Sequence, residues 1–423
     1  MINRALFSRK PKIPIVFVPG LFGSMSDVIL PGTGNWHFGL AGIVYQPFIK
    51  MLERMGYKEG EDLFIAYYDW RKPIESNAKH YLLPVIEEAK GKTASKKVNI
   101  ISHSMGGLVS RAYVQSKLYH NDVDQLIMIA TPNAGSAPNF SFWTGGEMPD
   151  TDDTSVNLVH IYMKVYLWLL SQLHPQNPIE AIHSHFPSLG DIVPSRLYEN
   201  YIIEHSYSNI MQWKPYSKLK TKNPFLDHLN EKQYTLSERG IRLCIIAGIG
   251  ISTVQRLEVT KDKKHDKQWV DGRVVRTIKT ESGDGNATAS SVCILKGDQY
   301  ILPGTHNEIL LKSESILRKK LWTDRNEGED YSSLTWNEYI VLCWSGEGEL
   351  LIQKDDSCEV TVYQDNIVYG FGYAFILGKS MSGIKVYYHA NQDSELKCRV
   401  SRFKVEDFMI HRRLNKKEQI QII

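Results

Sequence analysis

Three residues far apart along the chain stand in contexts that suit nucleophilic catalysis, and the first is a serine. Ser104 lies in the string Ile100-Ile101-Ser102-His103-Ser104-Met105-Gly106-Gly107, between an apolar strand and a helical pattern. A serine on such a turn is held in a strained conformation, with its hydroxyl projecting from the edge of a sheet. The strain requires small residues two positions before and after, and Ser102 and Gly106 provide them. This pattern indicates attack by the hydroxyl on an acyl carbonyl.

An acid and a base are needed next, because a serine hydroxyl attacks only when an oriented base takes its proton. On a strand–turn–helix nucleophile the order along the chain is serine, acid, histidine. Asp284 lies in a glycine-flanked loop after the apolar run 241–247, and His306 precedes an amphipathic pattern over residues 308–320. We therefore predict Ser104, Asp284 and His306 as the catalytic residues.

Other acids and histidines fit less well. Asp271 also stands in an Asp-Gly pair, but its polar and basic surroundings indicate a hairpin. His103 adjoins the serine, and alternation along the turn directs its side chain away from the hydroxyl. His183, His185 and His228 fall in a long insertion and are expected to be structural or surface residues.

Backbone N–H groups are expected to hold the oxyanion. The amide of Met105 follows the nucleophile directly, and a second donor is expected from the loop of residues 18–24 after the first apolar strand. Leu21 and Phe22 are both candidates; the spacing does not decide between them, and Leu21 is preferred. Pro19-Gly20 is also a common simple turn.

The elements around these residues predict an α/β-hydrolase architecture over residues 1–329. Strands without polar alternation must be covered on both faces, and their alternation with helices is typical of a mostly parallel sheet. Apolar strands are expected at 13–18, 63–68, 98–101, 125–130 and 241–247, with helices at 76–90 and 106–119.

Residues 133–239 are too many for a plain connection and predict an inserted lid with helices of its own. Within it, residues 156–170 are nearly all apolar but include a lysine and a histidine. A membrane-spanning helix needs about 20 apolar residues, and a single pass here would separate Ser104 from Asp284 and His306. A buried lid helix is the preferred interpretation, and peripheral membrane contact through the lid is the alternative.

From about residue 330 the pattern becomes all-β. Strand-like segments follow each other without a helical period, with Gly, Asp and Asn between them, which predicts a small sandwich over residues 330–423. The segments are 339–344, 349–353, 359–363, 373–377, 384–389 and 397–403. The sequence does not indicate a partner for this domain.

Composition excludes several classes of protein. The net charge of +3 gives no reason to expect nucleic acid as a partner. Five cysteines without CxxC spacing indicate neither disulfides nor zinc and fit a cytoplasmic protein, and residues 1–20 lack the apolar core of a signal peptide. The histidines lack metal-ligand spacing and there is no glycine-rich phosphate loop, so neither a metal nor a cofactor is expected.

Taken together, the motifs resemble the lecithin:cholesterol acyltransferase family of lipases, acyltransferases and phospholipases. The resemblance rests on Val18-Pro19-Gly20 with Gly23, Tyr68-Asp69-Trp70-Arg71, His103-Ser104-Met105-Gly106-Gly107 and Gly283-Asp284-Gly285. The stretch from Phe186-Pro187-Ser188 to Val193-Pro194 is similar to a Pro-Ser…Leu-Pro segment of that family's lid. Two departures are Ser102, and Asn286-Ala287 where the family usually has Thr-Val.

The resemblance implies cleavage of acyl esters of lipids through an acyl-serine on Ser104, with Asp284 as acid and His306 as base. It leaves open whether water or a lipid alcohol accepts the acyl group. Asp69 is expected to pair with Arg71 or a nearby amide, in a structural role. Two alternatives are a carboxylesterase or thioesterase for small soluble esters, and a binding protein on a hydrolase scaffold.

Overall fold

The computed structural model divides the chain into two compact units, with the C-terminal strands in the second. It describes residues 12–26, 36–146, 178–205, 211–260, 268–321, 338–355, 360–367, 371–378, 380–402 and 405–423.

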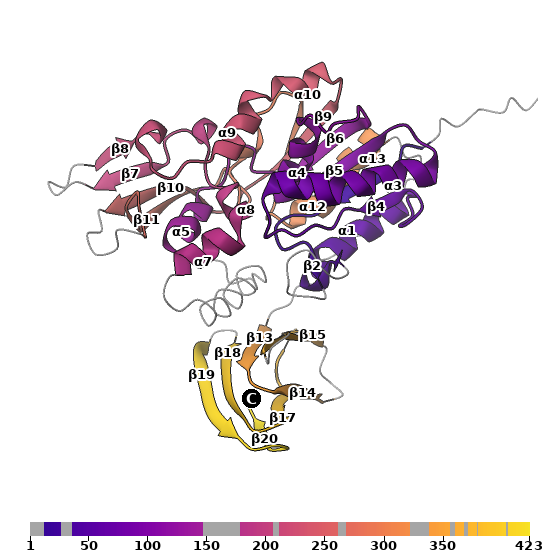
Figure 1. Ribbon diagram of the computed structural model, residues 1–423. Coiled ribbons are helices and arrows are strands. Elements are labelled where there is room, and N and C mark those ends of the chain that lie inside the picture. The colour runs from indigo at the N-terminus through magenta and orange to yellow at the C-terminus, as the bar shows by residue number, and fades with distance from the viewer. Residues whose placement is uncertain are drawn as a thin grey trace, which may run out of the picture. The chain divides into compact units, whose positions relative to one another are not determined.

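A parallel sheet of six strands forms the centre of the first unit, in the order β12-β9-β6-β5-β1-β4 (Figure 1). The strands are β1 (Ile15–Val18), β4 (Leu63–Ile65), β5 (Val98–His103), β6 (Val123–Ile129), β9 (Arg242–Ile249) and β12 (Asp298–Pro303). The chain runs from β1 to β4 on one side and then crosses to β5 on the other. Ligand sites of such sheets lie at the carboxyl ends of the strands where the order reverses, which here are β1 and β5.

Helices cover both faces of this sheet. On one face pack α3 (Leu83–Thr93) and α4 (Met105–Val114), and on the other α1 (Gly42–Arg54), α12 (Glu308–Lys312) and α13 (Glu314–Leu321). Phe17, Ile101 and Ile246 are fully buried under the second group. The apolar strands are therefore covered on both sides, and the predicted α/β-hydrolase fold is confirmed.

Shorter elements complete the connections of the first part of the chain. The π-helical turn η2 joins α2 to α3, and α11 precedes the edge strand β12. Their bounds are β2 (Met25–Ser26), β3 (Trp36–His37), η1 (Gly39–Ala41), α2 (Ile74–Asn77), η2 (Ala78–Leu82) and α11 (Ala289–Val292).

The described part of the insertion combines the expected helices with strands that the sequence did not predict. Its helices are α5 (Pro138–Gly145), α7 (Pro178–His185), α8 (Pro187–Gly190), η3 (Arg196–Tyr198), η4 (Tyr216–Lys218), α9 (Pro224–Glu231) and α10 (Tyr234–Glu238). A second sheet, β11-β10-β7-β8, joins β7 (Ile202–His205) and β8 (Met211–Lys214) to β10 (Thr253–Thr260) and β11 (Arg273–Thr280). The antiparallel pair β10–β11 confirms the hairpin predicted around Asp271. The apolar run 156–170 lies outside the described residues.

The C-terminal strands form two antiparallel sheets around one core. The sheets are β15-β16-β13-β18-β19 and β14-β17-β20, and Trp344, Tyr388 and Cys398 are buried between them. The predicted all-β fold is confirmed, with β19 and β20 in addition. The strands are β13 (Glu338–Ser345), β14 (Gly348–Lys354), β15 (Val360–Ile367), β16 (Phe371–Gly378), β17 (Ile384–Ala390), β18 (Ser394–Arg402), β19 (Val405–Leu414) and β20 (Gln419–Gln421).

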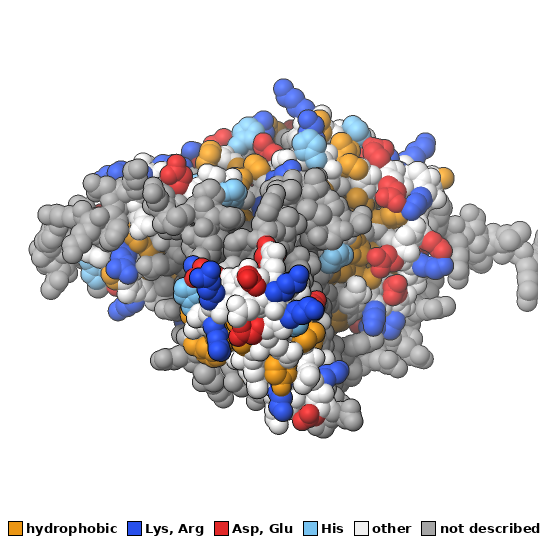
Figure 2. Space-filling view, turned by 60° about the horizontal axis from the view of Figure 1, so that its bottom comes forward, with side chains coloured by type: hydrophobic (Ala, Val, Ile, Leu, Met, Phe, Trp, Pro, Cys, Tyr) orange, Lys and Arg blue, Asp and Glu red, His pale blue; other side chains and the backbone are white. Residues whose placement is uncertain are grey.

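Charges of both signs share the described surface. On the face in Figure 2, lysine and arginine side chains lie among acidic ones, in keeping with the net charge of +3. Within the described ranges, no helix is both long and apolar enough to cross a bilayer.

Candidate active site

Ser104 stands at the carboxyl end of β5, in a strained turn that leads into α4. Its φ of 53° and ψ of −129° lie in a region that residues with a Cβ rarely adopt. Its N–H donates to the carbonyl of Ile129 at 2.9 Å, which anchors the turn to β6. A Cβ on Gly106 would collide with the carbonyl oxygens of Val18 and Pro19. The small residue after the nucleophile is therefore required by the close approach of α4 to β1.

Ser102 occupies the other small position of the turn. Its side chain is fully buried, and its hydroxyl donates to the carbonyl of Ile127 at 3.2 Å. The departure from glycine is thus accommodated by one hydrogen bond to the neighbouring strand.

Asp284 and His306 are brought together in loops at the same edge of the sheet. Nδ1 of His306 lies 2.8 Å from Oδ2 of Asp284, whose side chain is fully buried. The other carboxylate oxygen accepts the N–H groups of Asn286 at 2.9 Å and Ala287 at 2.8 Å. Backbone groups make these bonds, so the departure from Thr-Val at these two positions leaves the carboxylate held. A carboxylate at Nδ1 keeps the proton on that nitrogen and leaves Nε2 as an acceptor.

The second ring nitrogen of His306, Nε2, differs from Nδ1 in its surroundings. Nε2 is buried and makes no hydrogen bond to any described residue, and Ser104 itself is 7% exposed. The two residues are linked through His103, whose Nε2 lies 2.9 Å from the carbonyl oxygen of His306. A buried nitrogen without a partner is rare in folded proteins and demands an explanation. A proton acceptor that awaits its donor is one such explanation.

The loop after β1 approaches the serine from the other side. A Cβ on Gly20 would lie 2.8 Å from Cβ of Ser104, so only glycine fits without displacement. The Gly20 N–H already donates to the hydroxyl of Tyr45 at 2.8 Å. The next amide is that of Leu21, and no described residue accepts a hydrogen bond from it. The Met105 amide opens α4 and has no acceptor within the helix.

Phe22 turns this loop with a φ of 60° and is buried. Its ring meets that of Trp70 edge-on at 4.4 Å, and Trp70 stacks on Phe186 of the insertion at 5.4 Å with an angle of 4° between the ring planes. The hydroxyl of Ser188 donates to the Trp70 carbonyl. Trp70 thus joins the loop after β1 to the insertion.

Asp69 and Arg71 flank this tryptophan and form a buried ion pair. Nε of Arg71 lies 2.7 Å from Oδ1 of Asp69, and Nη2 lies 3.1 Å from Oδ2. Asp69 is fully buried and Arg71 is 7% exposed. The structural role predicted for this string is confirmed. Tyr68 adds a hydrogen bond from its hydroxyl to the carbonyl of Pro19 at 2.8 Å, beside the same loop.

The acid and the histidines that the sequence offered as weaker candidates lie in other surroundings. Asp271 accepts the amides of Lys220 and Thr221 and pairs with Lys214 at 3.0 Å, which makes it a structural carboxylate of the second sheet. His183 stacks on Trp143 with ring centroids 3.8 Å apart. His228 lies in α9.

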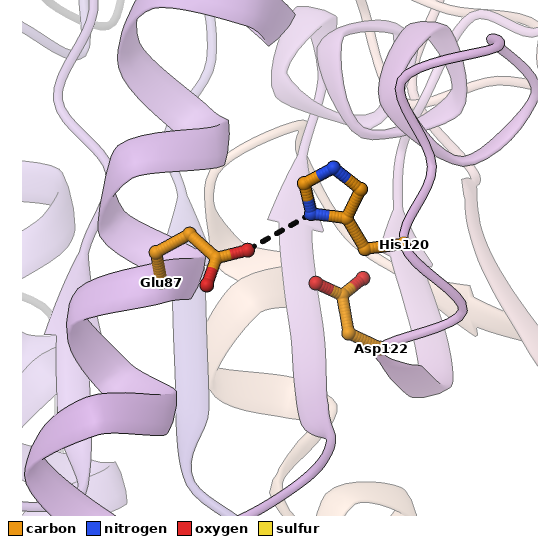
Figure 3. Close-up of side chains that lie close together, drawn as sticks. All are labelled: Glu87, His120 and Asp122. Atoms are coloured by element: carbon orange, nitrogen blue, oxygen red, sulfur yellow. Dashed lines mark hydrogen bonds and ion pairs between the residues drawn. The ribbon is translucent and has the colours of Figure 1, made fainter.

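One further cluster joins groups that could hold a metal ion. Figure 3 shows Glu87 of α3 beside His120 and Asp122 in the loop before β6. The ammonium group of Lys90, however, lies 3.0 Å from both Glu87 and Asp122, and Tyr113 donates to the other oxygen of Asp122 at 2.7 Å. A lysine thus supplies the positive charge within this cluster, and these contacts describe an ion-pair network at the surface.

Comparison with known proteins finds similarity to one family of acyltransferases. Residues 38–235 match the family model of lecithin:cholesterol acyltransferase. Phospholipase A(1) LCAT3 of Arabidopsis thaliana is 32% identical over 142 residues, which are 32% of this chain and 30% of that protein. Lecithin-cholesterol acyltransferase-like 4 of the same plant is 36% identical over 104 residues, 22% and 18% of the two chains. This chain therefore spans less than a third of each of these relatives.

Among solved structures, the chain is similar to Bacillus licheniformis lipase BlEst2 in its propeptide form. The identity is 12% and the TM-score 0.42, over 99% of this chain and 97% of that one.

Proposed function

Because residues 38–235 of this chain match the family model of lecithin:cholesterol acyltransferase, we propose that it is a serine hydrolase or acyltransferase acting on acyl esters of lipids. The observation that carries the proposal is the Asp284–His306 pair at the sheet edge where Ser104 follows β5, because the Nε2 of His306 has no hydrogen-bond partner among the described residues. Ser104, Asp284 and His306 follow one another along the chain in the order of nucleophile, acid and base that is expected for this fold.

The reaction follows from these positions. Nε2 of His306 takes the proton of the Ser104 hydroxyl, whose oxygen attacks the carbonyl carbon of the ester. The amides of Met105 and Leu21 hold the resulting oxyanion, with Phe22 as the alternative donor. His306 then passes its proton to the departing alcohol, and the acyl group remains on Ser104. Asp284 stabilises the imidazolium throughout.

Release of the acyl group needs a second nucleophile. Water yields a free fatty acid, and a lipid alcohol yields a new ester. In each case His306 takes the proton of the attacking hydroxyl and gives it to the oxygen of Ser104 as the bond between the acyl group and that oxygen breaks. Peripheral contact with a membrane through the insertion is part of this proposal. The proposal also places the protein in a reducing compartment such as the cytoplasm, and the free thiols of Cys244, Cys293 and Cys398 support this.

Turnover of p-nitrophenyl esters of increasing chain length tests the proposal. Ser104→Ala should lower kcat/KM by roughly four to six orders of magnitude if the three residues act as a unit. Ser237→Ala is the matched control, since this exposed hydroxyl only bonds the carbonyl of Tyr234, and it should leave turnover unchanged. Retained activity in Ser104→Ala would remove the serine from its role.

Labelling with a fluorophosphonate separates the alternatives. Native protein should be labelled at Ser104, and heat-denatured protein should not. Absence of labelling would favour a binding protein on a hydrolase scaffold. Preference for acetyl over long acyl esters would favour a carboxylesterase or thioesterase for small soluble esters. Lipidomics of wild type against Ser104→Ala then identifies the natural ester and the acceptor.

A further inference from the structure

His103, directly before the nucleophile, has both of its ring nitrogens engaged by other parts of the site. Nδ1 lies 2.9 Å from the hydroxyl of Tyr45 on α1, and Nε2 lies 2.9 Å from the carbonyl oxygen of His306. The side chain is 2% exposed. Both ring nitrogens of this buried side chain are therefore satisfied, and the two groups that satisfy them belong to separate elements of the site.

The partners determine where the hydrogens lie. A carbonyl oxygen only accepts, so Nε2 of His103 carries the proton and donates to His306. Nδ1 is then the acceptor, and the hydroxyl of Tyr45 donates to it. The Tyr45 oxygen in turn accepts the N–H of Gly20 at 2.8 Å. One directed chain of hydrogen bonds therefore runs from the loop after β1, through Tyr45 and His103, to the backbone of His306.

The charge state of His103 suits its place beside His306. The two rings are 4.8 Å apart between centroids. Burial, and then the neighbouring His306, lower the pKa of His103 well below its usual value. The ring is therefore neutral at pH 7 and places no positive charge beside the imidazolium that forms on His306.

We propose that His103 is a positioning residue, which fixes the backbone of His306 and, through Tyr45, the oxyanion loop at Gly20. The inference rests on the proposed function, since it gives His103 a role in that same site. His103 touches neither the ester nor the transferred proton. It keeps the loop after β1 and the loop that contains His306 at a fixed distance from each other. Catalytic activity falls steeply when such pre-organised groups are displaced.

Side chains that keep one bond at a time make the inference testable. The amide nitrogen of a glutamine reaches about as far as Nε2, so His103→Gln keeps a donor for His306. An asparagine reaches about as far as Nδ1, so His103→Asn keeps only an acceptor for Tyr45. His103→Leu keeps neither. Tyr45→Phe removes one hydroxyl with little change of volume, and serves should the His103 variants fold poorly.

We expect His103→Leu and His103→Asn to lower kcat for p-nitrophenyl butyrate by about ten- to one-hundred-fold, with KM within twofold. His103→Gln should recover most of the loss, and Tyr45→Phe should lower kcat by about three- to tenfold. His80→Leu is the matched control, because this exposed imidazole bonds only to Ser76 of the preceding turn among the described residues, and it should keep full activity. Unfolding in urea is followed for each variant.

Wild-type kcat in His103→Leu would overturn the inference. So would a loss of kcat that follows the loss of stability and ignores the retained donor, with glutamine no better than asparagine. Ser104→Ala, assayed in parallel, tests the proposed function separately. If Ser104→Ala is inactive while His103→Leu is fully active, only the role of His103 falls. If Ser104→Ala is active, the proposed function falls as well.

Discussion

Replacing Gly20 by alanine adds one methyl group where the loop after β1 meets the nucleophile. The new carbon would lie 2.8 Å from Cβ of Ser104, 3.0 Å from the hydroxyl oxygen of Tyr45 and 3.3 Å from Nδ1 of His103. Non-bonded carbons pack at about 3.5 Å or more. The loop or the serine must therefore move by about 0.7 Å. Ser104 is held in its strained turn by β6, so most of the movement is expected in the loop.

Two effects of this displacement have different sizes. Overpacking a tight site costs about 1–3 kcal/mol of the free energy of unfolding. A shift approaching 1 Å between the oxyanion donors and the nucleophile should lower kcat by about ten- to one-hundred-fold. The kcat of Gly20→Ala should therefore be lower than that of wild type even under conditions in which both proteins are fully folded.

The assay pairs urea unfolding with turnover of p-nitrophenyl butyrate. Gly91→Ala in α3 is the control, because nothing lies within 4 Å of the added carbon there; it should gain about 0.5–1 kcal/mol of stability from the better helix propensity of alanine. If Gly20→Ala behaves like Gly91→Ala in both measurements, the close approach of the oxyanion loop to the serine is refuted.

Two further predictions concern Asp191 of the insertion and the buried ion pair of Asp69 with Arg71. Asp191 accepts the N–H of Ile74 at 2.9 Å, and burial raises the pKa of this carboxyl group to about 7. Because the folded state favours the protonated carboxyl, the contribution of Asp191 to the free energy of unfolding is full below about pH 4 and is lost as the pH rises through 7. Asp191→Asn should therefore be more stable than wild type at pH 8, by up to about 2 kcal/mol, and equal to it near pH 4 in urea unfolding; lower stability at pH 8 would contradict this. Arg71→Met leaves Asp69 buried without its partner and should cost about 3–5 kcal/mol, while a second change, Asp69→Leu, should restore much of it. A cost below 1 kcal/mol for the single change would show that Asp69 finds another partner.

Long apolar strands were predictable because burial on both faces removes polar alternation. The run 241–247 was recognised on this basis, and β9 extends it by only two residues at its end. The edge strand β12 was missed, because its residues alternate between exposed and half-buried and it ends at a proline. The two strands of the insertion were missed because they are short. Strands β7 and β8 have four residues each, and they gain their regularity by pairing, β7 with β10 and β8 with β7.

The candidate site was predictable where a residue's local context reflects its geometry. Ser104 is marked by its turn, and Asp284 by the glycines on both sides. Tyr45 carries no such mark, since it lies on an ordinary amphipathic helix and meets His103 across 58 positions of sequence. Alternation along the turn predicts that the side chain of His103 points away from the serine hydroxyl, but the sequence contains no information about the partners that the side chain meets there.

The row of rings formed by Phe22, Trp70 and Phe186 has a consequence for protein engineering. Consider a chimaera in which a foreign lid replaces the insertion. Here a graft that removed Phe186 and Ser188 would also strip the support from one side of Trp70, and so loosen the turn at Phe22 that neighbours the serine. Chimaeras of this chain should therefore keep residues 186–188 on the recipient side of the splice.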